Sequence, residues 1–218
     1  MKWLRQIRSF NDFILTIIIS DFFVNSAFAS VAPVFAIFIT RQIQGGDAAV
    51  AGFATASLWL TKAIFQLPIA KFLDRTDGES DDFKALFFGS LAMSAVPVMY
   101  LFVSLPWHLY LVQAFLGFCL SWVVPAWYAL FTRHVDQFRI SFEWSLDSVF
   151  SVSIATAIAA AFGGLVANRF GFDALFIFSS IFLLIGAFLL LPLRNKIRKK
   201  EFAERLFPEK RFFQKPRV

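Results

Sequence analysis

Six long apolar runs constrain the fold of this chain more than any other feature of its sequence. The runs lie at residues 13–40, 48–71, 83–104, 108–132, 144–168 and 172–193, and short polar segments separate them. A helix rises about 1.5 Å per residue, so about 20 residues cross the hydrocarbon core of a bilayer. The sequence therefore predicts an all-α integral membrane protein, in which residues 13–193 form a bundle of six transmembrane helices.

Positive charge is distributed unequally between the two sides of this predicted bundle. Of the 21 Lys and Arg residues, 18 fall in the lead 1–12, beside the second and fourth polar breaks, or in the tail 194–218. Cytoplasmic segments retain positive charge, so we expect a plasma (inner) membrane protein with both termini cytoplasmic. The basic tail is expected either to lie on an anionic bilayer surface or to act as a solvated, positively charged anchor on the cytoplasmic side. This topology accounts for the net charge of +6, so we expect a lipid bilayer and no nucleic acid as partner.

The sequence contains no pattern that indicates catalysis, a metal site or a cofactor. The only cysteine, Cys119, lies in an apolar run and can form neither a disulfide nor a thiolate metal site within the chain. His108 and His134 have no neighbouring metal ligands, and we expect both side chains to be solvated. Phosphate-binding glycine loops, zinc-protease helices and Cys-x-x-Cys pairs are missing from the sequence. We therefore expect no enzyme activity and no cofactor.

Short segments of the chain recur with a period of three predicted helices. Residues 30–35 are similar to residues 122–127, residues 70–75 to residues 164–169, and residues 85–87 to residues 174–176, in the same order along the chain. A unit of three helices crosses the membrane an odd number of times, so its second copy enters from the opposite face. The sequence thus predicts two inverted three-helix repeats, at about 13–104 and 108–193, which are typical of secondary transporters. Accidental similarity between apolar segments is the alternative.

Two segments carry most of a transporter motif, Gly-x-x-x-Asp-Arg-x-Gly. Residues 70–78 keep Asp74 and Arg75, have alanine in place of the first glycine, and have the second glycine one residue late. Residues 164–171 keep both glycines and the arginine, with asparagine in place of the acid. Residues 163–164 match the closing glycine pair of a helix-five motif. In these segments the chain resembles the N-terminal six-helix half of a major facilitator superfamily transporter.

The resemblance implies a secondary transporter that moves a small solute by alternating access between two helical bundles. Members of that family usually have twelve helices, so it also implies a half-size transporter that works as a homodimer or with a second six-helix half. Glu79, Asp81 and Asp82 replace the basic end of the first motif, and Gln113 stands where proton-coupled members carry an arginine. The alternatives are one half of a split transporter, or a membrane assembly or scaffold protein that transports nothing.

Polar side chains inside the apolar runs are the candidates for solute binding or coupling. Asp21 and Lys62 each lie about nine residues from the cytoplasmic end of a predicted helix, so both are roughly 13 Å deep and an ion pair between them is possible. Asn25 and Gln66 lie one turn further along the same faces, and Gln113 matches Asp21 in the repeat. Intramembrane ions usually face a bundle interior or a cavity. A buried pair that only fixes the first two helices is the alternative.

A second group of charged residues lies near the predicted cytoplasmic face. By resemblance, Asp74 and Arg75 belong to a cytoplasmic gate whose ion pairs break and re-form during alternating access. Arg133, Glu143 and Asp147 are expected at the same face and complete this candidate gate. The alternative is ordinary stabilisation, because acids near a helix N-terminus interact favourably with its dipole.

Overall fold

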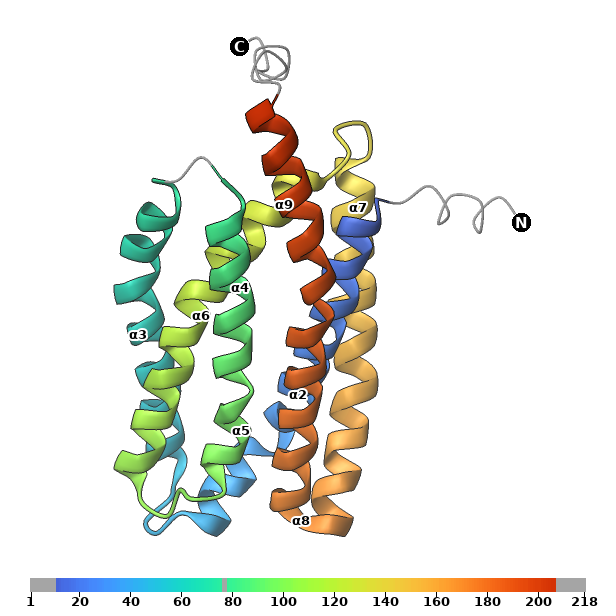
Figure 1. The fold of residues 1–218 in the computed structure, drawn as a ribbon. Coiled ribbons are helices and arrows are strands. Elements are labelled where there is room, and N and C mark those ends of the chain that lie inside the picture. Colours follow the sequence, from blue (N-terminus) through green and yellow to red (C-terminus); the bar gives the residue numbers. More distant parts are fainter. Residues whose placement is uncertain (1–10, 76–77, 207–218) are drawn as a thin grey trace, which may run out of the picture.

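The computed structural model describes residues 11–75 and 78–206, and these residues form helices with no strand among them. In chain order the elements are α2 (Asp12–Gln42), α3 (Ala48–Leu73), α4 (Ser80–Met93), α5 (Ala95–Tyr100), α6 (Pro106–His134), α7 (Ile140–Asp147), η1 (Ser148–Ile154), α8 (Ala155–Leu189) and α9 (Leu191–Leu206). The element η1 is a π-helix. The start of α2 and the end of α9 lie at the same end of the bundle (Figure 1).

Five helical spans in the described part of the chain are long and apolar enough to cross a membrane. Helices predicted at 13–40, 48–71 and 108–132 fall within α2, α3 and α6. The fifth span, Ile140–Arg198, contains 59 residues and covers the last two predicted helices. Within it, Gly171 has φ 84° and ψ 175°, which are not helical angles, and the chain reverses direction there (Figure 1). An all-helical membrane bundle is therefore confirmed, whereas the count of six stays a prediction.

The domain boundaries also stay predictions. Most of the lead 1–12 lies outside the described residues, because the structure begins at Asn11. The tail 194–218 begins inside α9, where Leu193 and Ile197 are buried, and its residues 207–218 lie outside the described part.

Local sequence explains where several helices begin and break. The side chains of Asn11 and Asp47 accept hydrogen bonds from backbone N–H groups in the first turns of α2 and α3, as N-cap residues do. The helix predicted at 83–104 is divided into α4 and α5 at Ser94. Pro97 explains the break, because its ring clashes with the carbonyl of residue i−4 and it has no N–H to donate to that carbonyl.

The first arm of the fifth span runs beside α2 in the same direction. Ser151 Oγ donates to the carbonyl oxygen of Ile18 at 2.9 Å, near the start of α2. Twelve residues further along both segments, the backbone of Gly163 lies against Ser30, so closely that an added Cβ would be 2.0 Å from the Ser30 carbonyl oxygen. Glycine is required at this position because the two backbones approach so closely.

The second arm, beyond Gly171, runs beside α2 in the opposite direction. Ser20 Oγ donates to the carbonyl oxygen of Gly186 at 2.8 Å, and the hydroxyls of Ser30 and Ser179 are 2.9 Å apart. All of these serines are buried. Hydrogen bonds and close backbone packing drive helix association in lipid, where the hydrophobic effect between helices is absent. The α2–α8 unit is therefore held by serines and glycines.

The remaining long helices form a second packed pair, α3 with α6. An added Cβ at Gly117 of α6 would be 2.3 Å from the carbonyl oxygen of Leu58 of α3, which is another close backbone contact. Ser57 Oγ donates to the carbonyl oxygen of Tyr110 at 2.9 Å. The outer face of α3 is open, because only 11% of its most apolar stretch is buried. α2 and α3 have few contacts with each other although they are consecutive in the chain.

Candidate functional site

A cavity of about 400 Å³ lies between α2, α6 and the α7–η1 segment, with Met93 of α4 on its wall. Its lining combines polar side chains, aromatic rings and aliphatic groups: Asp21, Val24, Asn25, Phe28, Met93, Leu120, Val123, Val124, Trp127, Tyr128, Trp144, Asp147, Ser148 and Val152. This size is in the range of small-molecule sites, which are usually apolar with a few polar groups. We call it the acidic cavity because two carboxylates line it.

The polar wall of the acidic cavity is formed by α2 and by the junction of α7 with η1. Asn25 Nδ2 donates to Asp21 Oδ2 at 2.7 Å, one helical turn away, so these two predicted residues act as a unit. Asp147 is only 6% exposed, and its Oδ1 has no hydrogen-bond partner among the described residues. The π-helix begins directly after Asp147. Short π-helical segments inside α-helices occur frequently at functional sites.

Three aromatic rings form another wall of the acidic cavity. The ring centroids of Trp127 and Trp144 are 5.7 Å apart and those of Tyr128 and Trp144 are 6.0 Å apart. Phe131 packs behind them, with its centroid 4.6 Å from that of Trp144 and 4.9 Å from that of Trp127. Each ring is fixed by at least one other ring, so this wall is pre-formed.

The other predicted binding residues lie elsewhere. Lys62 does not pair with Asp21 in the described structure; its Nζ lies 4.8 Å from the ring centroid of Trp59, on the half-exposed side of α3. Gln66, one turn along, is also half-buried. Gln113 is buried and lines a separate cavity of about 300 Å³, and its Oε1 has no hydrogen-bond partner in the described part of the chain. The binding roles of these residues stay predictions.

The predicted gate residues lie on several elements, and two of them, Asp74 and Arg133, are both near Asp82. Asp74 is exposed and forms the C-cap of α3, and Arg75 beside it is exposed as well. Arg133 pairs with Asp82. Glu143 is buried and accepts a hydrogen bond from the backbone N–H of Asp136 at 3.1 Å, and Asp147 lines the acidic cavity instead. A gating role for these residues stays a prediction.

His134 was expected to be a solvated loop residue, and the structure shows otherwise. It lies in the last turn of α6 with a side chain only 13% exposed, and its Nε2 is 3.3 Å from Glu79 Oε2. Its ring stacks on Phe13 with the centroids 3.5 Å apart. Together with the pair formed by Arg133 and Asp82, it connects the start of α4 to the end of α6. The signal was present in the sequence, because acids begin the third predicted helix and basic residues end the fourth.

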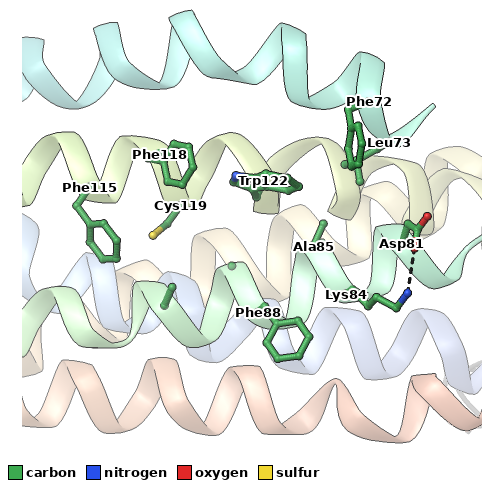
Figure 2. A pocket seen from close by; sticks show the side chains of 12 residues that line it. Phe72, Leu73, Asp81, Lys84, Ala85, Phe88, Phe115, Phe118, Cys119 and Trp122 are labelled. Carbon is green, nitrogen blue, oxygen red and sulfur yellow. Dashed lines mark hydrogen bonds and ion pairs between the residues drawn. The ribbon is translucent and has the colours of Figure 1, made fainter. Parts of the chain in front are cut away.

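A second, larger groove of about 450 Å³ lies between α3, α4 and α6. Figure 2 shows that α6 contributes Phe115, Phe118, Cys119 and Trp122, while Phe88 and Ala85 come from α4. Its charged groups are Lys84 and Asp81, which pair with each other at 3.1 Å at one end (Figure 2). Among the described residues that line this groove, no fully buried side-chain nitrogen or oxygen lacks a hydrogen-bond partner, in contrast to the acidic cavity. The acidic cavity is therefore the better candidate for binding a solute.

Comparisons with known proteins identify the family of this chain. A comparison with curated proteins and one with solved structures each gave no match. A family model, described as Major Facilitator Superfamily, matches residues 15–217, which include every long helix of the structure. Members of this family are membrane transporters. The chain therefore belongs to the Major Facilitator Superfamily.

Proposed function

We propose that this chain is the six-helix half of a secondary transporter and that it moves a small solute by alternating access. The two arms of the fifth span then count as two crossings, which gives six in total and both termini on the same side of the membrane. The positive charge of the lead and the tail makes that side the cytoplasmic side of the plasma membrane. The inverted three-helix repeat predicted from the sequence fits this arrangement, since inverted repeats can exchange which face is open.

The observation that carries the proposal is the acidic cavity. Asp21 and Asn25 are the tenth and fourteenth residues of the 31-residue helix α2, about 14 and 20 Å along its axis, so the cavity is at the depth of the bilayer core. Charged groups at that depth are costly unless they are paired or hydrated, and in known cases they mark substrate or ion paths. A cavity that holds such groups is typical of a transport site.

Alternating access needs a second bundle against which this one rocks. We propose that a second copy of the chain supplies it. The open face of α3 and the large exposed side chains Trp59, Leu60 and Ile64 leave apolar surface that lipid or a second copy would cover. The measurement is the mass of the purified chain in nanodiscs, where a dimer supports the proposal and a strict monomer contradicts it.

Solute uptake tests the proposed function directly. Proteoliposomes containing the purified chain are incubated with a defined mixture of amino acids, sugars, nucleosides, carboxylates and amines, and the lumen is analysed by mass spectrometry. We expect at least one solute to accumulate with the wild type and to accumulate less with Asp21→Asn. The matched control is Asp173→Asn, because Asp173 is exposed near the Gly171 turn and lines no part of the acidic cavity.

Two results would contradict the proposal. If no solute accumulates with the wild type, the chain is a non-transporting membrane protein such as an assembly or scaffold partner. If a solute accumulates equally with the wild type and Asp21→Asn, the acidic cavity is not on its path.

A further inference from the structure

The two carboxylates of the acidic cavity have no basic side chain beside them in its lining. Asp21 and Asp147 line the same cavity and are close enough to interact electrostatically. Asn25 contributes one hydrogen bond to Asp21. The Ser151 hydroxyl lies beside the Asp147 carboxylate, but Asp147 Oδ1 has no hydrogen-bond partner among the described residues. An unpaired buried carboxylate is costly, and a cation beside it offsets that cost.

The basic side chains of the described structure are engaged elsewhere or absent from this cavity. None of the 14 residues that line it is Lys, Arg or His. Arg133 pairs with Asp82. Lys62 lies over the ring of Trp59, on α3, which contributes nothing to the lining. The lining itself therefore supplies no positive charge, and a cation or a proton that neutralises the carboxylates comes from outside it.

The aromatic wall indicates what kind of cation fits. Trp127, Tyr128 and Trp144 present three fixed rings to the cavity, and the face of an aromatic ring attracts an organic cation within about 6 Å of its centroid. Trp127 Nε1 is buried and has no hydrogen-bond partner in the described structure, so an acceptor on the solute would satisfy it. Carboxylates on one wall and rings on another match an ammonium group with apolar substituents.

We infer that the acidic cavity binds an organic monocation, an ammonium compound that places its charged nitrogen between Asp147, Asp21 and the aromatic rings. This inference rests on the proposed function and names the class of solute. A metal ion fits the site less well, because hard cations need six or more oxygen ligands and no group of three His, Cys, Asp or Glu residues that could hold a metal is found among the described residues. An anionic solute would meet two carboxylates.

Binding is measured apart from transport. The purified chain in nanodiscs of neutral lipid is equilibrated by dialysis with radiolabelled choline or tetraethylammonium. We expect saturable binding of at least one of these cations. A hundredfold excess of 3,3-dimethylbutan-1-ol, in which carbon replaces the nitrogen of choline, should leave choline binding unchanged.

Variants connect the binding to the named residues. Asp147→Asn and Trp144→Leu should each weaken binding at least tenfold, whereas Trp144→Phe, which keeps a ring, should weaken it less. Asp173→Asn and Trp107→Leu are the matched controls, since Asp173 and Trp107 are exposed and lie outside the cavity, and both should bind as the wild type does. Size-exclusion profiles and thermal melting of each variant show whether it is folded.

The outcomes separate this inference from the proposed function. Absence of binding of both cations, equal displacement by the neutral alcohol, or wild-type affinity in folded Asp147→Asn would each overturn the inference. If a neutral or anionic solute is taken up and neither cation competes, transport stands and the cation site is wrong. If the cations bind as expected but no solute is transported, the site stands and the proposed transport function is wrong.

Discussion

Gly163 of α8 lies directly against the backbone of α2, and its replacement by alanine gives a direct test of how the bundle is held together. The added methyl group would be 2.0 Å from the carbonyl oxygen of Ser30 and 2.7 Å from its Cα. Ordinary contact begins at 3.4 Å, so the methyl group is about 1.4 Å too close, and both obstacles are backbone atoms that no rotamer change can move. The two helices must separate.

The cost has two parts. Overpacking of a tightly packed helix interface costs about 1 to 3 kcal/mol. Separation also stretches the hydrogen bond between Ser30 and Ser179, and interhelical bonds in lipid contribute on average about 0.6 kcal/mol. We therefore expect Gly163→Ala to lower the free energy of unfolding by about 2 to 4 kcal/mol.

The neighbouring residue supplies the control. An added Cβ at Gly164 meets no atom within 4 Å, and alanine favours a helix over glycine, so Gly164→Ala should leave the free energy of unfolding unchanged or raise it by up to about 1 kcal/mol. Both variants are unfolded by titration with sodium dodecyl sulfate in mixed micelles, and helix content is followed by circular dichroism and packing by tryptophan fluorescence. If Gly163→Ala is no less stable than Gly164→Ala, the close contact described for α2 and α8 is wrong.

Two further predictions concern the helix ends and the turn. Arg133→Gln should cost about 1 to 2 kcal/mol because it leaves the nearly buried Asp82 carboxylate without its partner, and adding Asp82→Asn should recover most of that loss. A double-mutant cycle in the same titration checks this, and additive single effects would refute the pairing. Gly171→Ala should cost about 1 to 3 kcal/mol, because φ 84° with ψ 175° is open almost only to glycine. Gly52→Ala is the control, because an added Cβ at Gly52 meets no atom within 4 Å. If the two variants are equally stable, alanine is not strained at position 171.

The positions of the long helices could be predicted from the sequence, because length and hydropathy decide whether a segment crosses a bilayer. The division of the helix at 83–104 was missed, although Pro97 was visible in the sequence. The effect of a proline in a membrane helix depends on neighbours that replace the lost hydrogen bond. α2, α3 and α6 continue through Pro33, Pro68 and Pro125, so proline alone did not identify the break at Ser94.

The candidate site could be predicted only in part. Asp21 and Asn25 were identified because one turn of helix separates them, which is a local relation. An ion pair between Asp21 and Lys62 was possible by depth, but α2 packs on α8 and α3 on α6, so the two side chains lie on helices that hardly touch. Depth along a helix can be read from sequence, whereas the choice of neighbouring helix depends on the whole bundle.

Asp147 shows that sequence-based prediction is also limited within a single helix. Its place near the start of a predicted helix indicated the cytoplasmic gate, four residues after Glu143. The π-helix that follows it has a wider turn than an α-helix, so the α-helical spacing of the sequence does not give the direction of side chains beyond that point. The aromatic wall was missed because Trp127, Tyr128 and Trp144 stand among many apolar residues of similar spacing.

The hydrogen bonds of α2 have a consequence for biosynthesis. Its contacts at Ser20, Ser30 and Ile18 are made with residues 166, 149 and 133 positions later in the chain. A ribosome adds about 5 to 20 residues per second, so α2 waits about 10 to 30 seconds for its last partner to be made. Until Gly186 is made, the Ser20 hydroxyl lacks its acceptor on α8, whereas the Ser30 hydroxyl can already donate to the carbonyl oxygen of Ala27 within α2. Although α2 precedes the other described helices in the chain, it is thus among the last of them to gain its full set of contacts in the bundle.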